Sequence, residues 1–178
     1  MTNTLTPLQP DLLTELRQLI DSARRRVAVA VNAELTLLYW HVGERIHREI
    51  LGGQRAGYGD EVVAALARQL SAEYGRGWSA RQLRLCIRFA QTYPEVQIVH
   101  TLCAKLSWSH LRLLAALDDA IQRDFYTGLC QLENWSVRQL QERMQSMLFE
   151  RTAISRQPEE TIAHELQVLR QEQVVNPA

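Results

Sequence analysis

The chain has 178 residues, of which 46% are hydrophobic, and its 20 basic residues balance its 20 acidic ones. So apolar a composition excludes a disordered chain, and no apolar run approaches the roughly 20 residues of a membrane span. The first residues lack the basic and apolar regions of a signal peptide, and the three cysteines, Cys86, Cys103 and Cys130, have no paired spacing. We therefore expect a cytoplasmic protein that is not associated with a membrane and has three buried free thiols.

Residues 1–10 are a polar leader with two prolines, and a helix is predicted from there to about Ile50. Apolar residues recur in it at spacings of three and four, the period of an amphipathic helix. Forty helical residues would span roughly 60 Å, longer than a compact domain of this size, so the helix either breaks near residues 21–26 or projects. A homodimer through residues 11–50 is one hypothesis. The alternative is that the apolar stripe packs on later helices of the same chain.

Polar residues interrupt this helix and glycines follow it. Asn32 and Glu34 lie in its most apolar part, where they could fix the register of a partner, bind a ligand, be satisfied locally or point to solvent. Residues 52–59 contain four glycines and predict helix termination and a flexible connection. A phosphate-binding loop is the weaker alternative, because the Gly-Lys-Ser/Thr ending of a P-loop is missing.

The next two predicted helices are joined by a tight turn. The first covers residues 60–74, capped by Asp60, and ends at two glycines. The second covers residues 79–92; Ser79 caps it and Gln82 stands at the capping-box spacing. A helix, a glycine turn and a capped helix are the parts of a helix-turn-helix, whose second helix enters the DNA major groove.

The second of these helices predicts a basic outer face. Arg81, Arg84 and Arg88 fall within about 60° of one another, opposite an apolar face. That apolar face consists of Leu83, Cys86, Ile87 and Ala90, with Phe89 at its edge. Residues 74–117 carry a net charge of +5, from six basic residues and one acid. We predict DNA binding with Arg81, Arg84 and Arg88 as main contacts and Arg76, Gln82 and Arg112 on the rim. The alternative is a solvated basic face without a ligand.

The remaining chain predicts further helices and hence an all-α fold: a long N-terminal helix, then a helical bundle with helix-turn-helix-like units. Residues 95–104 are irregular or form a short helix, and a further helix follows from Ser107 to about Leu117. Asp118-Asp119 then turns the chain or caps the next helix, which runs to about Cys130. Residues 11–155 form the domain, and residues 156–178 a connector helix and tail.

A hexapeptide, Trp-Ser-x-Arg-Gln-Leu, occurs at residues 78–83 and again at 135–140. The second copy predicts a capped helix with a buried stripe, which consists of Val137, Leu140, Met144, Met147 and Leu148. Acidic residues mix with the arginines there, so we expect this second helix-turn-helix-like unit to serve packing first and DNA second.

No catalytic, metal or cofactor site is predicted. The five histidines are scattered, and His100-x-x-Cys103 has no second half-site with matching spacing. His110 follows a helix start, where it could face a partner or a phosphate as readily as a metal. Asp118 and Asp119 are adjacent and would point about 100° apart on a helix, which is no acid/base pair.

Several motifs in one order resemble a known family. They are Asn32-x-Glu34, Leu38-Tyr39-Trp40, Tyr74-Gly75-x-Gly77-Trp78-Ser79, Leu106-Ser107-Trp108-Ser109-His110, Phe125-Tyr126 and Trp135-Ser136-Val137-Arg138-x-Leu140. Over roughly residues 12–155 the chain resembles the N-terminal domain of the bacterial YhcG-type proteins, a domain of unknown function. Residues 106–144 also resemble, more faintly, the helix-turn-helix of ParB-like partition proteins.

This resemblance implies a helical, DNA-binding domain that is usually followed by a PD-(D/E)xK nuclease domain. Such a nuclease needs a Glu-x-Lys, in which carboxylates hold Mg²⁺ and the lysine supports the attacking water. Lys105 is the only lysine, and Cys103 stands two residues before it. We therefore predict a non-enzymatic module that targets a nuclease-type system to double-stranded DNA, with a nuclease domain or subunit as a further partner. The competing hypothesis is a helical module that dimerises or docks a nuclease through its first helix.

Overall fold

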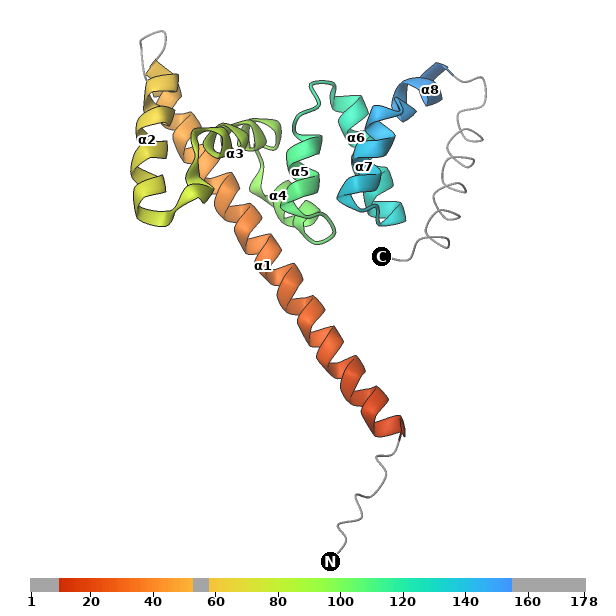
Figure 1. Cartoon of the computed structure of the whole chain (residues 1–178). Helices are drawn as coiled ribbons and strands as arrows, with labels where there is room; N and C mark the ends of the chain where they lie inside the picture. The colour runs from red at the N-terminus through yellow and green to blue at the C-terminus, as the bar shows by residue number, and fades with distance from the viewer. Residues whose placement is uncertain (1–9, 53–57, 155–178) are drawn as a thin grey trace, which may run out of the picture.

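The structure is a computed structural model that describes residues 10–52 and 58–154 (Figure 1). Within these ranges all regular structure is helical, which confirms the all-α prediction. In chain order the elements are α1 (Pro10–Gly52), α2 (Tyr58–Tyr74), the 3-10 turn η1 (Arg76–Trp78), α3 (Ala80–Thr92), α4 (Val96–Cys103), α5 (Trp108–Leu114), α6 (Ala120–Glu133), α7 (Val137–Gln145) and α8 (Leu148–Ile154). The expected leader, most of the glycine loop and the C-terminal connector helix lie outside the described residues.

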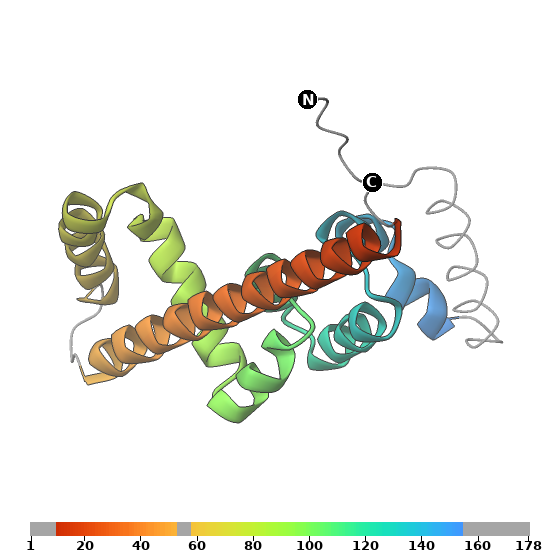
Figure 2. The ribbon, with the colours of Figure 1, turned by 90° about the horizontal axis from the view of Figure 1, so that it is seen from below.

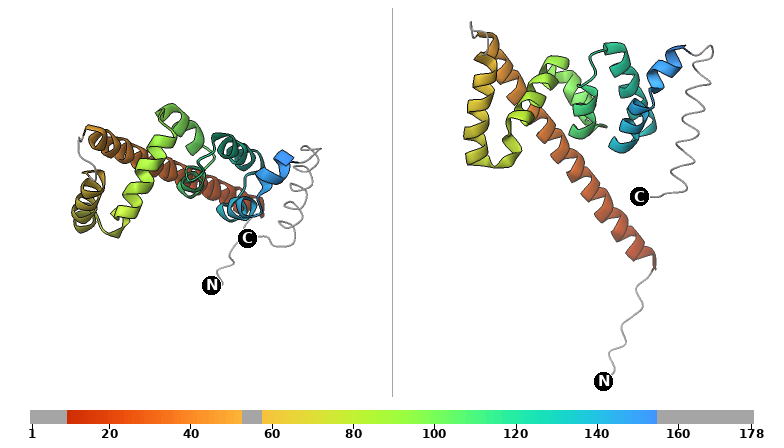
Figure 3. Two further views of the ribbon diagram at one scale, coloured as in Figure 1. Left: turned by 90° about the horizontal axis from the view of Figure 1, so that it is seen from above. Right: turned by 45° about the horizontal axis from the view of Figure 1, so that its top comes forward.

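Helix α1 is unbroken over 43 residues, so of the two alternatives, a break near residues 21–26 or a projecting first half, the structure supports the second (Figure 1). At 1.5 Å per residue it is about 65 Å long. Its first half projects from the other helices, and from Asp11 to Val31 every side chain is exposed except that of Ser22, which is half-buried (Figures 1 and 3). Proline and glycine are absent between residues 11 and 42, so nothing in the sequence interrupts the helix. No helix in the described ranges is long and apolar enough to cross a membrane.

The second half of α1 packs on the domain, and α3 crosses it (Figure 2). Trp40 and Ile46 are buried. A Cβ atom added to Gly43 would lie 2.0 Å from the backbone oxygen of Cys86, so only glycine allows this close approach of the two helices. The Trp40 indole also donates a hydrogen bond of 2.7 Å to the backbone oxygen of Tyr93, at the end of α3.

Asn32 joins α1 to the loop before α5. Its Nδ2 donates to the backbone oxygen of Leu106 at 3.2 Å, and its Oδ1 accepts from the backbone N–H of Trp108 at 3.1 Å. Asn32 is therefore satisfied within its own chain, by residues 74 and 76 positions further along. Glu34, by contrast, is exposed.

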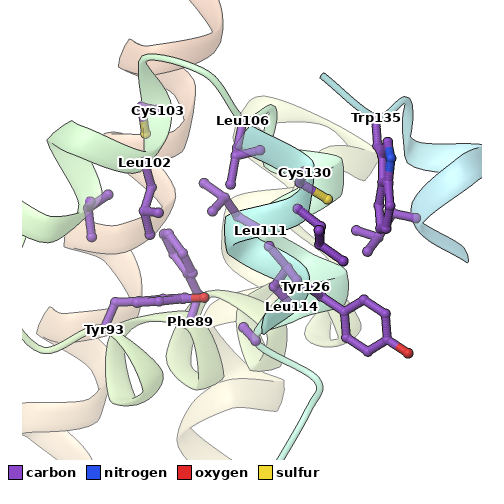
Figure 4. Packing of buried hydrophobic residues seen from close by; sticks show 14 of the residues in the cluster. Phe89, Tyr93, Leu102, Cys103, Leu106, Leu111, Leu114, Tyr126, Cys130 and Trp135 are labelled. Atoms are coloured by element: carbon purple, nitrogen blue, oxygen red, sulfur yellow. The ribbon is translucent and has the colours of Figure 1, made fainter. Parts of the chain in front are cut away.

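The main core joins α1 to the helices that follow α2. Figure 4 shows its centre, where Phe89, Leu111, Leu114 and Tyr126 are fully buried. The helical position of Phe89 predicted that it lies at the edge of the apolar face of α3. In the structure it lies at the centre of the packing instead. A smaller cluster of Ile46, Val63, Ala67 and Leu83 holds α2 against α1 and α3.

The three cysteines are buried free thiols, as predicted. Burial raises the pKa of Cys86 and of Cys130 to about 12, and it also raises the pKa of Cys103. A thiol with so high a pKa stays protonated and is a poor nucleophile. These side chains therefore fill the core.

Some boundaries differ from the prediction. Helix α2 begins at Tyr58, so Asp60 lies in its first turn and is not its cap. Residues 96–103 form the short helix α4, and α5 ends at Leu114. Met147, predicted to be buried, is 55% exposed with a φ of 55°, because the chain turns there between α7 and α8.

Candidate nucleic-acid interface

A glycine turn positions α3. Helix α2 ends at Tyr74, and Gly75 follows with a φ of 90°, in the region that favours glycine. After the 3-10 turn, Ser79 begins α3 and its hydroxyl accepts from the backbone N–H of Gln82 at 3.3 Å. This cap is the predicted one, and it fixes the direction in which α3 leaves the turn.

Arg76 and Arg81 are the most available cations of this region. Both are exposed, one in the 3-10 turn and one in the first turn of α3. Within the described part of the chain, neither has an ion pair with an acidic side chain. Their guanidinium groups can therefore bind an anion without first leaving a carboxylate.

Arg84 lies one turn further along α3 and is paired. Its guanidinium contacts the carboxylate of Asp60 at 2.9 Å, and both side chains are more than half exposed. An exposed pair of this kind contributes about 0–1 kcal/mol and weakens with salt. A phosphate could replace Asp60 at little cost.

Arg88 is held more firmly. It donates to the backbone oxygens of Ala115 and Ala116, both at 2.7 Å, and to the carboxylate of Asp118 at 2.9 Å. The two carbonyls belong to the end of α5, where they have no partner inside the helix. Arg88 therefore ties α3 to α5, and its charge is fixed in place.

The arginine face is consequently less free of acids than the sequence suggested. Residues 76–92 contain none, but the fold brings Asp60 from α2 and Asp118 from the loop before α6 against it. Asp60 is 24 residues from Arg84 in sequence, and Asp118 is 30 residues from Arg88. Both acids therefore fall outside residues 74–117, over which the net charge was counted.

An open hollow of about 550 Å³ lies between α3, the end of α5 and α6. Arg84, Arg88 and Arg123 line it together with Gln91 and Asp118. Arg123 donates to the backbone oxygen of Leu117 at 2.9 Å and is a cation that the sequence did not single out. Three nearby aspartates outnumber it in a sequence window, and only the fold places it beside the α3 arginines.

Two of the predicted rim residues are not fully exposed. Gln82 is half-buried, and its amide lies 3.7 Å from the sulfur of Cys86, so it does not complete a capping box. Arg112 is half-buried on α5 and does not line the hollow. The cations best presented to a ligand are therefore Arg76, Arg81 and Arg84.

His110 has a structural role. Its Nδ1 accepts from the backbone N–H of Ser107 at 3.2 Å, so Nε2 carries the proton and donates to the backbone oxygen of Trp135 at 2.9 Å. Burial lowers its pKa below the ordinary 6.5, although hydrogen bonds to the backbone of Trp135 and Ser136 oppose this. Among the described residues no three histidine, cysteine or acidic side chains could together hold a metal ion.

The fold and these surfaces define an all-α domain with exposed arginines on the 3-10 turn and on α3. The sequence profile of the DUF1016 N-terminal domain family matches residues 15–151, and the chain belongs to this family. It is similar to the protein named "Putative nuclease YhcG" of Escherichia coli (strain K12), with 33% identity over 167 residues.

That alignment covers 77% of this chain and 44% of the relative, so the chain spans less than half the length of that protein. Only the N-terminal domain of the family is recognised in this chain. No solved structure matches the chain.

Proposed function

We propose that this domain binds double-stranded DNA through α3 and serves as the targeting part of a nuclease-type system. The observation that carries the proposal is the exposed set of Arg76, in the 3-10 turn, and Arg81 and Arg84, in the first two turns of α3. In a helix-turn-helix, the first turns of the recognition helix contact base edges and phosphates in the major groove. Helix α2, the glycine turn and α3 supply the corresponding parts.

Arginine suits both contacts that such a helix makes. Its planar guanidinium binds a phosphate or the guanine edge with two parallel hydrogen bonds. Arg84 would exchange Asp60 for such a partner, whereas Arg88 would contribute its charge from its fixed position beside α5. Gln82 and Arg112 would lie at the margin of this surface.

The link to a nuclease rests on the relative. A protein that this chain resembles is named "Putative nuclease YhcG", and the chain covers less than half of it. We propose that the cutting activity resides in another domain or subunit, and that this domain brings it to DNA.

The proposal is tested by duplex-DNA binding across a salt series. Arg81→Ala/Arg84→Ala should weaken binding, and each lost phosphate contact should flatten the log–log salt slope by about 0.9. The control, Arg45→Ala/Arg48→Ala, removes the same charge from exposed positions on α1 and should leave the slope unchanged. No binding by the wild type at low salt, or equal effects of both double variants, would contradict the proposal.

A further inference from the structure

Helix α1 has two faces that serve different purposes. Its inner face, along Thr36, Trp40 and Gly43, packs on the rest of the domain. A second apolar row runs through the projecting half, and we name it the outer stripe. It consists of Leu13, Leu16, Ile20, Ala23, Val27 and Val31, all of them exposed.

The outer stripe points away from the domain. At 100° per residue, Val27 lies about 180° from Thr36, and the whole stripe falls within about 40° of that direction. The continuation of the inner face toward the N-terminus is mostly polar, with Gln18, Ser22 and Arg25. The described helices therefore cannot cover the outer stripe, and the alternative that it packs on later helices fails for α2–α8.

The spacing of the outer stripe is that of a coiled-coil seam. Its members follow one another at steps of three, four, three, four and four residues. Alternation of three and four places the side chains of a helix along one line that a second helix can cover. From Leu13 to Val31 the line is about 27 Å long.

The apolar surface is large enough for a stable contact. The exposed Leu, Ile and Val side chains on this side of α1 are 39–65% accessible; they are Leu12, Leu13, Leu16, Leu19, Ile20, Val27, Val31, Leu35 and Leu38. Together these side chains expose on the order of 800 Å² of surface. This area is comparable with what each partner buries in a standard interface, and it exceeds the largest apolar patch of a typical monomer.

We propose that a second copy of this chain covers the outer stripe, so that the projecting halves of two α1 helices form a coiled-coil homodimer. A seam that repeats the same side chains is complementary to itself, which a two-fold contact requires. Residues 11–31 contain four arginines and three acids, a net charge of +1, so two copies would repel each other little. The inner face and α3 would remain as they are in one chain.

Sedimentation equilibrium of the whole chain over a dilution series tests this proposal, with two matched variants. Val27 is 63% and Val29 51% exposed, and they lie about 160° apart on α1. The wild type should be a dimer. Val27→Asp, which puts a carboxylate into the seam, should weaken the dimer more than about tenfold, and Val29→Asp should leave it intact.

Several outcomes would overturn it. They are a monomeric wild type at every concentration, a dimer that Val27→Asp leaves intact, and equal weakening by both variants. If the chain is monomeric and Val27→Asp lowers its free energy of unfolding, another segment of the same chain covers the stripe. DNA binding is measured separately, so a monomer that binds DNA would overturn only the dimer.

Discussion

The two copies of the Trp-Ser-x-Arg-Gln-Leu hexapeptide begin α3 and α7 in the same way but face different surroundings. In the second copy, Trp135 is 3% exposed and Arg138 pairs with Glu142 at 2.9 Å on its own helix. In the first, Trp78 is only half-buried and Arg81 is exposed. One local pattern therefore sets the start of both helices. The tertiary surroundings decide how deeply the tryptophan is buried, and the residue four positions further along decides whether the arginine has an acidic partner on its own helix.

The caps show the same contrast. Ser136 and Gln139 form a complete capping box, with the backbone N–H of Ser136 donating to the Gln139 side chain at 2.8 Å. Ser79 accepts from the Gln82 backbone, but the Gln82 side chain turns to Cys86 instead. The start of α7 is thus held by reciprocal capping hydrogen bonds, and the start of α3 by one.

The largest difference between the copies should appear when the tryptophans are removed. Trp135→Ala should lower the free energy of unfolding by about 3–5 kcal/mol, because it empties a fully packed site. Trp78 is half-buried beside the smaller cluster and packs edge-on to Tyr39, so Trp78→Ala should cost roughly half as much. Urea unfolding followed by circular dichroism measures both. Equal losses would contradict the contrast in packing.

His110, which binds the Trp135 backbone, should give the second copy a pH dependence. The unfolded chain binds the His110 proton more readily than the folded one, because burial lowers its pKa. The stability that neutral His110 contributes is full above pH 6.5 and is lost as the pH falls through its lower folded pKa.

His110→Gln can replace the contacts of only one of the two ring nitrogens and should cost about 2 kcal/mol at neutral pH. Its unfolding free energy should also fall less than that of the wild type between about pH 7.5 and about pH 5. Urea unfolding at several pH values measures this difference. Parallel curves for the two proteins would show that His110 does not titrate in this range.

The cap residues should give the smallest difference. Ser136→Ala should cost about 1.5 kcal/mol, and Ser79→Ala about 0.5 kcal/mol, because only the first substitution breaks a reciprocal box. The same unfolding measurements apply. A greater loss for Ser79→Ala would mean that the start of α3 is more tightly fixed than its hydrogen bonds indicate.

Features that depend on neighbours in sequence could be predicted. The all-α fold and the Ser79, Asp119 and Ser136 caps follow from short patterns that the structure retains. The burial of Leu83, Cys86 and Ala90 on the apolar face of α3 follows from helical spacing, and it is confirmed too.

Features that depend on residues distant in sequence could not be predicted. The pairing of Arg84 with Asp60, the fixing of Arg88 by α5 and the place of Arg123 all arise where separate helices meet. Met147 shows a further limit, since its spacing continued the stripe of α7 although the helix had already ended. Apolar spacing marked α1 as amphipathic, but not which of its faces the domain would cover.

The most direct test of the account compares the fourth residues of the two hexapeptides. Arg81→Ala and Arg138→Ala remove the same side chain from the same position of the pattern, and both arginines are exposed. In a salt series of duplex-DNA binding, Arg81→Ala should weaken binding and flatten the log–log slope by about 0.9, whereas Arg138→Ala should match the wild type. If both variants bind as the wild type does, or if Arg138→Ala has the larger effect, α3 is not the DNA-binding helix.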